Sequence, residues 1–260
     1  MPKPKILLIE CARADNSFLA KLIFLLKKEK LFYSVCSRAN LSFDSFKDID
    51  IAISIGGDGT YLRASHYNIK TPQLGINPFP ETKEGFFTRS NINDAETAIK
   101  KLAKYDFKIT NLLRLEAKIN CRLVDELALN EFYIGPKKPF ELFNYELKAD
   151  NFPAEFQRSS GLLIGTPAGS YAWSKSAGGE SLALDSKAFQ VIVREPYVGK
   201  LNKPPQIVKK IFSTNSKISI KIRSYQGIIV ADSVGTEYEF NENDVIEVMP
   251  SKNSLKLIDF

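Results

Sequence analysis

Histidine and cysteine are scarce in this 260-residue sequence, and their scarcity excludes one common class of site. His66 is the only histidine, and the three cysteines, Cys11, Cys36 and Cys121, are far apart and form no CxxC pair. Zinc is usually held by closely spaced Cys and His ligands, so a zinc site of that kind is excluded. Free buried thiols in a reducing compartment are the simplest interpretation of the cysteines.

Long apolar runs are also missing. The most apolar stretch, residues 22–26, is short and has a lysine on each side, so it cannot span a bilayer. The sequence opens with Met-Pro-Lys-Pro-Lys directly before an apolar strand, which is unlike a signal peptide. We therefore expect a cytoplasmic protein that does not act at a membrane.

Charge is only mildly unbalanced, with 36 basic and 30 acidic side chains and a net charge of +6. That excess would favour anionic ligands such as nucleotides. The lysines are spread along the chain without a long basic tract, which favours a solvated basic surface over a nucleic-acid-binding face. A chain of this length can form one large domain or two modest ones, each with a real core.

The first hundred residues alternate between two periods. Residues 5–9, 51–55 and 71–77 are short apolar runs, whereas residues 15–30, a stretch from about 60, and residues 93–104 have helical spacing. Strands that are apolar on both faces and separated by helices indicate a parallel sheet covered on both sides.

After about residue 107 the pattern changes. Residues 115–119, 145–149 and 218–222 alternate apolar and polar side chains, as strands with one solvated face do. The sequence thus predicts an α/β domain with a parallel sheet (1–107) and a β-rich, antiparallel sandwich-like domain (108–245). A C-terminal strand segment (246–260) is expected to return to the first domain.

The first candidate site is the Ser-Ile-Gly-Gly-Asp-Gly-Thr stretch at residues 54–60, where a buried strand ends and a helix begins. Such a turn lets the backbone approach a ligand, and the helix start offers unpaired amides to an anion. A bare glycine turn is more often only a turn. Asp58 changes that balance, because phosphates would repel a carboxylate unless it serves a magnesium ion or removes a proton.

Positive charge at this turn would have to come from outside the motif, since the lysine of a P-loop is missing. Arg63, in the first turns of the predicted helix, is one candidate. A solvated helix arginine is an equally good interpretation of that residue.

The second candidate site is a polar pair, Asn130 and Glu131, within the apolar stretch 127–134. Neighbours on a strand point to opposite faces, so both cannot face water if both faces of the strand are covered. Burying an amide and a carboxylate without partners would cost several kcal/mol. Ribose hydroxyls of a ligand would be natural partners; the alternative is an exposed strand end.

The third candidate site spans residues 161–179, where a strand runs into a loop of small and hydroxyl residues and then a short helix. Ser170 could simply cap that helix. The many small residues around Trp173 would also form a surface that a flat base can approach.

These motifs carry a resemblance. The Gly-Gly-Asp-Gly tetrad resembles a kinase superfamily that includes NAD kinases, diacylglycerol and sphingosine kinases, and phosphofructokinases. The tetrad, the Asn-Glu strand and the Thr-Pro-x-Gly-Ser loop together resemble the NAD kinase family over nearly the whole chain. The resemblance implies that Asp58 is the catalytic aspartate and that Asn130 and Glu131 hold the adenosine ribose. The candidate substrate- and nucleotide-binding residues are Gly56, Gly57, Gly59, Thr60, Arg63, Asn130, Glu131, Arg158, Ser160, Thr166, Gly169, Ser170, Tyr171, Ala172, Trp173 and Ser176.

Three departures from the family pattern concern the nicotinamide half of the ligand. Ser160 stands where common family members have an acidic residue, as in the branch that includes mitochondrial NAD kinases and plant NADH kinases. Residues 77–85 form a longer turn than usual, and Ser233 follows Asp232 where the family often has glycine.

The resemblance implies transfer of the ATP γ-phosphoryl group to the 2′-hydroxyl of the adenosine ribose of NAD, or also of NADH. Asp58 would act as general base, while Mg²⁺ and the amides of the glycine turn stabilise charge on the phosphates. No residue is singled out as a metal ligand, and a homo-oligomer, dimer or tetramer, is expected. The alternatives are a non-catalytic dinucleotide sensor and a lipid kinase of the same superfamily, which would need a membrane-facing apolar surface.

Overall fold

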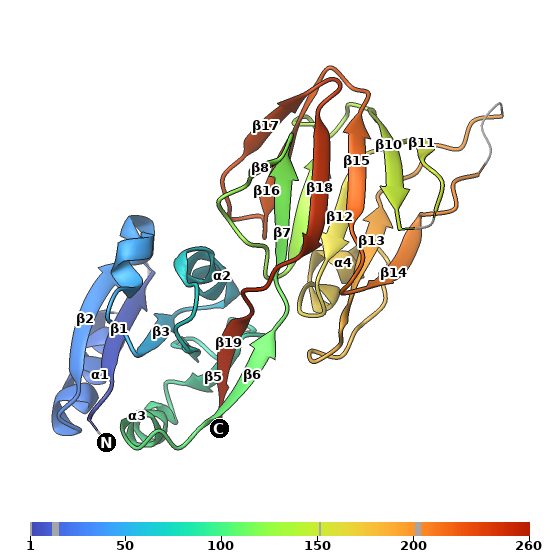
Figure 1. The fold of residues 1–260 in the computed structure, drawn as a ribbon. Coiled ribbons are helices and arrows are strands. Elements are labelled where there is room, and N and C mark those ends of the chain that lie inside the picture. The colour runs from blue at the N-terminus through green and yellow to red at the C-terminus, as the bar shows by residue number, and fades with distance from the viewer. Residues whose placement is uncertain (1, 12–15, 151, 201–203) are drawn as a thin grey trace. The chain divides into compact units, whose positions relative to one another are not determined.

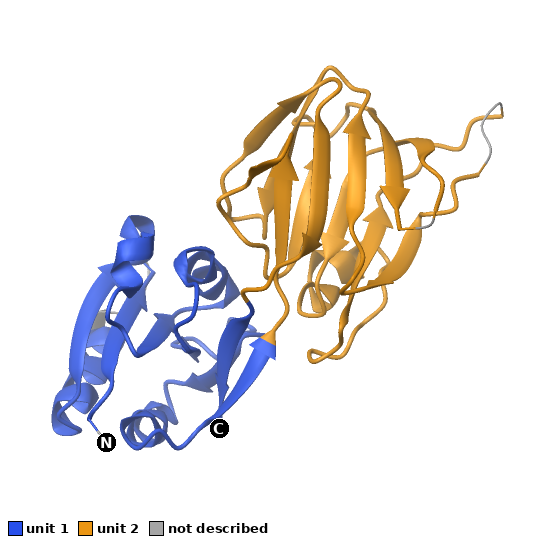
Figure 2. Cartoon of the chain, viewed as in Figure 1, with its two compact units in different colours: residues 1–111, 254–260 blue, residues 112–253 orange. Residues whose placement is uncertain are grey.

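The computed structural model describes residues 2–11, 16–150, 152–200 and 204–260. The chain forms two compact units (Figure 2): residues 1–111 with 254–260 are the first unit, and residues 112–253 are the second. The sequence suggested divisions at 107 and 245. No helix in the described ranges is both long and apolar enough to cross a membrane.

The first unit is built on a seven-stranded sheet with the order β2-β1-β3-β4-β19-β6, and β5 pairs with β4 off this path (Figure 1). The pairings of β1 with β2 and β3, and of β4 with β3, β5 and β19, are parallel. The elements of this unit are β1 (Lys5–Glu10), α1 (Asn16–Lys28), β2 (Phe32–Ser37), η1 (Arg38–Asn40), η2 (Phe43–Phe46), β3 (Ile51–Ile55), α2 (Asp58–Tyr67), β4 (Gln73–Asn77), β5 (Thr88–Asn91), α3 (Ala95–Ala103), β6 (Lys108–Leu112) and β19 (Leu255–Asp259).

Helices cover both faces of this sheet, as the doubly apolar strands predict. Ile6 and Leu8 of β1 pack with α1 and α3 on one face. Leu7 and Ile9 pack with Ala64 of α2 on the other. Each face therefore buries its own apolar cluster, which fixes the register of the strands and the point at which each strand ends.

The second unit contains two six-stranded sheets, β11-β10-β15-β18-β7-β8 and β14-β13-β12-β9-β16-β17, whose assigned pairings are antiparallel. The elements are β7 (Leu115–Ile119), β8 (Arg122–Leu123), β9 (Glu131–Gly135), β10 (Phe143–Ala149), β11 (Glu155–Ser159), β12 (Leu162–Gly165), η3 (Gly169–Tyr171), α4 (Trp173–Ser176), β13 (Ala188–Val193), β14 (Lys209–Ser213), β15 (Ile218–Ile222), β16 (Gln226–Ala231), β17 (Tyr238–Asn241) and β18 (Val245–Pro250).

A single apolar cluster draws on both sheets of the second unit, so the unit is a β-sandwich. Strands β10 and β15 alternate buried and less buried residues, which agrees with the period of two in the sequence. Strand β9 lies in the middle of its sheet, between β12 and β16. This pairing brings Glu131 opposite Gly165 and Phe132 opposite Ala231, so segments distant in sequence meet at the start of β9.

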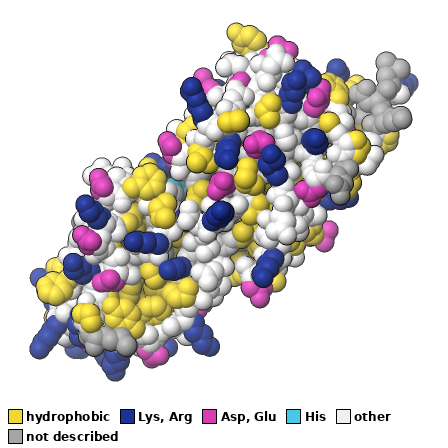
Figure 3. Space-filling view, viewed as in Figure 1, with side chains coloured by type: hydrophobic (Ala, Val, Ile, Leu, Met, Phe, Trp, Pro, Cys, Tyr) yellow, Lys and Arg dark blue, Asp and Glu magenta, His cyan; other side chains and the backbone are white. Residues whose placement is uncertain are grey.

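The C-terminal tail divides between the units. Strand β18 pairs with β15 and β7 inside the second unit, whereas β19 pairs with β4 in the first. The predicted helix at residues 15–30 is observed as α1; Asp15 lies outside the described residues. On the face shown in Figure 3, lysine and arginine side chains are scattered among acidic and neutral ones.

Candidate active site

The glycine turn of the first unit connects the buried strand β3 to helix α2. Gly56 has φ = 148°, and a Cβ there would lie 2.7 Å from Oγ1 of Thr60. A side chain at Gly56 would therefore be strained and would displace the first turn of the helix. Gly57 is the N-cap of α2, and glycine has no side chain that could cap the helix. The amides of Thr60 and Tyr61 donate to the carbonyl of Gly57 at 3.0 and 3.4 Å, which leaves the amides of Asp58 and Gly59 for other partners.

Asp58 is the first residue of α2, and its carboxylate is held by two backbone amides. The N–H groups of Phe86 and Phe87 donate to its two oxygens at 3.0 and 2.9 Å. Phe87 is buried and stacks on Tyr61 of the same helix, with ring centroids 4.9 Å apart. The carboxylate is therefore fixed in orientation while the residue stays only half-buried.

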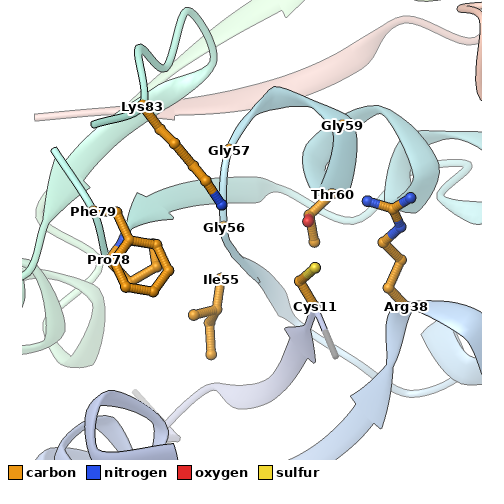
Figure 4. Close-up of a pocket in the computed structure, with 10 residues that line it drawn as sticks. All are labelled: Cys11, Arg38, Ile55, Gly56, Gly57, Gly59, Thr60, Pro78, Phe79 and Lys83. Atoms are coloured by element: carbon orange, nitrogen blue, oxygen red, sulfur yellow. The ribbon is translucent and has the colours of Figure 1, made fainter. Parts of the chain in front are cut away.

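A cavity of about 210 Å³ lies beside this turn (Figure 4). Gly56, Gly57, Gly59 and Thr60 line it from the turn. The other lining residues are Cys11, Arg38, Ile55, Pro78, Phe79 and Lys83.

The cavity's positive charge comes from residues that the sequence reasoning missed. Arg38 and Lys83 lie far from the glycine motif in sequence, and only the excess of basic residues hinted at such cations. Arg63, the candidate from sequence, places its guanidinium 5.1 Å from the ring centroid of Tyr67 and does not line this cavity.

In the second unit, Asn130 and Glu131 are only 7% and 3% exposed, so they do not form an exposed strand end. The carboxylate of Asp232 holds their backbone. It accepts N–H bonds from Leu129 at 2.9 Å, Asn130 at 2.6 Å and Glu131 at 3.2 Å. Sequence reasoning assigned no role to Asp232, which is more than a hundred residues beyond Leu129.

Asp232 and Ser233 both have φ = 55°, in the left-handed region. This backbone conformation favours glycine, which gives a physical reason for the glycine that often follows the aspartate. Here serine adopts it instead.

The polar ends of the pair lack partners. Oδ1 of Asn130, Oε2 of Glu131 and Oγ of the nearby Ser174 are buried with no hydrogen-bond partner among the described residues. Burial raises the pKa of Glu131 to about 8, the negative charge of Asp232 adds to the rise, and a backbone hydrogen bond from Ser174 opposes it. Buried polar atoms without partners cost free energy, so this arrangement is typical of a site that a ligand completes.

The loop after β12 is fastened to this pair. The amide of Thr166 donates to the carbonyl of Asn130 at 2.8 Å, and its hydroxyl donates to the carbonyl of Leu129 at 2.5 Å. The amide of Gly169 donates to Oγ1 of Thr166 at 3.1 Å. Gly169 lies so close to Asn130 that an added Cβ would overlap its carbonyl oxygen. Small residues in this loop therefore serve close approach of two backbones.

Ser170 does not cap α4, which was the alternative interpretation of this residue; the N-cap of α4 is Ala172. The Ser170 hydroxyl donates to the carbonyl of Pro167 at 2.7 Å and accepts from the amide of Leu182 at 2.8 Å. It ties the loop to the segment after α4, because it lies in η3 rather than at the start of α4.

Trp173 forms an aromatic layer with Tyr133 of β9. The two rings are nearly parallel with centroids 5.5 Å apart, and the guanidinium of Arg194 lies 5.0 Å from the Trp173 ring. Tyr171 and Ser176 are exposed and Ala172 is half-buried. This loop thus presents small and aromatic surface suited to a flat ring.

Arg158 and Ser160 lie at and just after strand β11. Arg158 is exposed, with its guanidinium 5.6 Å from the ring centroid of Phe156. The Ser160 amide donates to the carbonyl of Arg194 at 3.0 Å, and its carbonyl accepts from the Tyr133 hydroxyl at 3.4 Å. The backbone of Ser160 is therefore joined to Tyr133 of the aromatic layer and to Arg194, whose guanidinium lies beside the Trp173 ring.

No three His, Cys, Asp or Glu side chains in the described ranges form a cluster that could hold a metal ion. A magnesium ion that arrives with nucleotide phosphates needs only one or two protein carboxylates. Asp58 fits that requirement, because each carboxylate oxygen accepts one amide and keeps a further lone pair.

Comparisons with known proteins show which chains are similar to this one. The family model of the ATP-NAD kinase C-terminal domain matches residues 129–260. An NAD kinase of Methanopyrus kandleri is 32% identical over 226 residues, covering 86% of this chain and 77% of the relative. A probable NADH kinase of Oryza sativa is 28% identical and covers 81% of this chain and 71% of that protein.

The fold is also known from solved structures. The crystal structure of an NAD kinase from Archaeoglobus fulgidus in complex with ATP matches with a TM-score of 0.79 and 22% identity, over 97% of this chain and 92% of that chain. The match to the family model over half of the chain and the identity to the Methanopyrus kandleri kinase establish the relationship. The chain belongs to the NAD kinase family.

Proposed function

We propose that this protein uses ATP to phosphorylate the 2′-hydroxyl of the adenosine ribose of NAD, giving NADP. One observation carries the proposal: Oδ1 of Asn130 and Oε2 of Glu131 are buried side by side in the chain with no partner among the described residues. A ribose supplies two adjacent hydroxyls, which can donate to these two oxygens. The matching family model is described as the C-terminal domain of an ATP-NAD kinase, which supports ATP and NAD as the two substrates.

In this proposal each unit has its own task. Asn130 and Glu131 hold the ribose, and the small residues around Trp173 receive a flat ring. Asp58 takes the proton of the 2′-hydroxyl, and the free amides of α2 bind the phosphates of ATP. A magnesium ion bound to those phosphates would neutralise their charge, with Asp58 as the protein group suited to hold it.

NADH is included as a second acceptor. The rice relative is named a probable NADH kinase, and Ser160 lacks the negative charge that would favour the oxidised ring. We further propose a cytoplasmic homo-oligomer, dimer or tetramer, that serves NADP biosynthesis and binds neither nucleic acid nor membranes.

The direct test is an assay of the purified protein with ATP, Mg²⁺ and either NAD or NADH, in which NADP(H) is quantified with a coupled dehydrogenase. We expect NADP from NAD and NADPH from NADH, each dependent on ATP. If both dinucleotides bind but neither is converted, the protein is a dinucleotide sensor and the proposal is wrong.

A further inference from the structure

The cavity beside the glycine turn lies at the carboxyl ends of the parallel strands. Four of its lining residues come directly after the last residue of a strand: Cys11 after β1, Arg38 after β2, Gly56 after β3 and Pro78 after β4. The crevice at the carboxyl ends of parallel strands is the usual ligand site of open α/β sheets. Position in the fold therefore marks this cavity as a binding site, independently of the glycine motif.

The charge of the cavity wall has one sign. Among the described residues that line it, Arg38 and Lys83 are cationic and none carries a carboxylate. Asp58, although adjacent in sequence, turns its carboxylate to the amides of Phe86 and Phe87. Two cations and the free amides of α2 thus surround about 210 Å³ of space without a compensating anion, which suits a polyanion.

The two cations approach different glycines of the turn (Figure 4). A Cβ at Gly59 would lie 3.7 Å from Nη1 of Arg38, and a Cβ at Gly57 would lie 3.9 Å from Cδ of Lys83. Neither side chain has a salt bridge in the described part of the chain, and Nζ of Lys83 lies 5.0 Å from the ring centroid of Phe79. Both charges remain available to a ligand.

The long turn after β4 holds Lys83 in place through Asn77. The Oδ1 atom of Asn77 accepts from the amide of Phe79 at 2.9 Å, and its Nδ2 donates to the carbonyl of Lys83 at 2.7 Å. The amide of Lys83 also donates to the carbonyl of Phe79 at 2.9 Å. The Asn77 side chain therefore closes residues 77–83 into a hydrogen-bonded ring. The longer turn in this way positions a lysine beside the cavity.

We infer that Arg38 and Lys83 bind the phosphates of the phosphoryl donor and position them against the glycine turn. Asn77 acts on them only by positioning Lys83. This inference rests on the proposed function for the identity of the donor. It differs in content, because it assigns the donor's charge recognition to two residues outside the glycine motif and inside the first unit alone.

The kinetic test compares Arg38→Ala and Lys83→Ala with the wild type and with Lys104→Ala. Lys104 is an exposed lysine after α3 in the same unit, so this control removes the same charge away from the cavity. Loss of one charge-assisted contact should raise the KM for ATP by roughly tenfold or more in each cavity variant, with the KM for NAD within about twofold. Arg38→Lys should recover part of the loss. An ATP KM within about twofold of the wild type in both alanine variants would overturn the inference.

A binding test separates this inference from the proposed function, because it requires no turnover. Cys11 lines the cavity, whereas Cys121 is exposed in the second unit. Inorganic tripolyphosphate should slow alkylation of Cys11 by iodoacetamide, measured by peptide mass spectrometry, and leave Cys121 unaffected.

Protection of Cys11 should persist in Lys104→Ala and be lost when Arg38 and Lys83 are both alanine. Equal protection in the double variant, or no protection in the wild type, would contradict the inference whether or not NADP is formed. If Cys11 is protected in the wild type and not in the double variant, the inferred anion site is supported. If the same protein makes no NADP(H), the proposed function is refuted.

Discussion

Asn130 is the residue on which the proposed recognition of the ribose most depends. Its backbone is satisfied by Asp232 and Thr166, but its Oδ1 has no partner among the described residues. The folded protein therefore bears the free-energy cost of burying this atom, with no compensating hydrogen bond from the described residues. Binding of a hydroxyl would recover that bond.

Asn130→Ala should accordingly weaken NAD binding by about 1–3 kcal/mol, the range for a buried hydrogen bond left unmade. The thermal stability of the unliganded protein should change little, because the lost partner is the ligand. Fluorescence of Trp173, the only tryptophan, can follow the titration. Asn215→Ala, at an exposed position of the same unit, is the control. Unchanged affinity together with a large loss of stability would show that Asn130 serves the fold.

Glu131 makes stability depend on pH. Its pKa is raised from 4.5 to about 8 in the folded protein, chiefly by burial and further by Asp232. The folded state therefore holds the proton more tightly than the unfolded state does. The contribution of Glu131 to the free energy of unfolding should then fall as pH rises from about 4.5 to about 8.

Glu131→Gln removes this titration. The variant should match the wild type near pH 5 and become the more stable of the two by pH 8, with a difference on the order of a few kcal/mol. Urea denaturation followed by Trp173 fluorescence at several pH values measures it. Parallel pH profiles of the two proteins would mean that Glu131 ionises normally in the folded state.

We expect Ser160 to affect the choice between NAD and NADH. An acidic side chain near the nicotinamide would attract the positive ring of NAD, and at about 4–6 Å with an effective dielectric near 20 this is worth roughly 3–4 kcal/mol before screening. Ser160→Asp should therefore shift the ratio of kcat/KM values toward NAD. Kinetics with both substrates at two salt concentrations test this. A constant ratio in a folded, active variant would show that position 160 does not sense the ring.

At the scale of elements, the loop after β12 and the start of β9 are joined by backbone hydrogen bonds and close packing. Thr166 and Gly169 join the loop to the backbone of Asn130, and a Cβ at Gly169 would overlap the Asn130 carbonyl oxygen. The packing of two backbones therefore sets the position of Asn130 and Glu131, the pair that we propose binds the ribose.

Gly169→Ala should push the loop away and break the bond from the Thr166 amide to Asn130. We expect NAD affinity to fall at least tenfold, by analogy with the cost of one buried hydrogen bond, and the melting temperature to fall as well. Gly199→Ala, in an exposed segment of the same unit, provides the matched control. Wild-type affinity in Gly169→Ala would show that the loop can move without disturbing Asn130.

The sequence predicted those elements whose pattern is local. Strands β3, β7 and β15 were predicted with their observed bounds. A continuous apolar run (β3) or an alternation of apolar and polar residues (β7 and β15) can be recognised within five residues. Strand β2 was missed, since it lies at an edge of the sheet and is mostly exposed, so its pattern resembles a loop.

The site was predictable to the extent that its residues form motifs. Asp232 completes the site through the pairing of β16 with β9, a contact between segments a hundred residues apart. Arg38 reaches the cavity from the end of β2, and Lys83 reaches it from the turn after β4. Their positions follow from strand order, which no local pattern encodes.

At the scale of the whole molecule, the chain passes twice between its units. It leaves the first unit after residue 111, near the end of β6, and returns at residue 254, so β18 and β19 follow each other in sequence but belong to different sheets. Each unit has its own core and its own half of the candidate chemistry: the carboxylate and the cationic cavity in the first, the ribose-binding pair and the aromatic layer in the second. Binding and proton transfer should therefore be separable by mutation.

The measurement that tests this account most directly is the turnover of Asp58→Asn. Asparagine keeps the shape and can still accept one of the two amide bonds, but it cannot take a proton. We expect kcat to fall by roughly two to four orders of magnitude, while NAD affinity, followed by Trp173 fluorescence, changes far less and the protein remains folded. Near-normal NADP formation by folded Asp58→Asn would contradict the assignment of Asp58 as the general base.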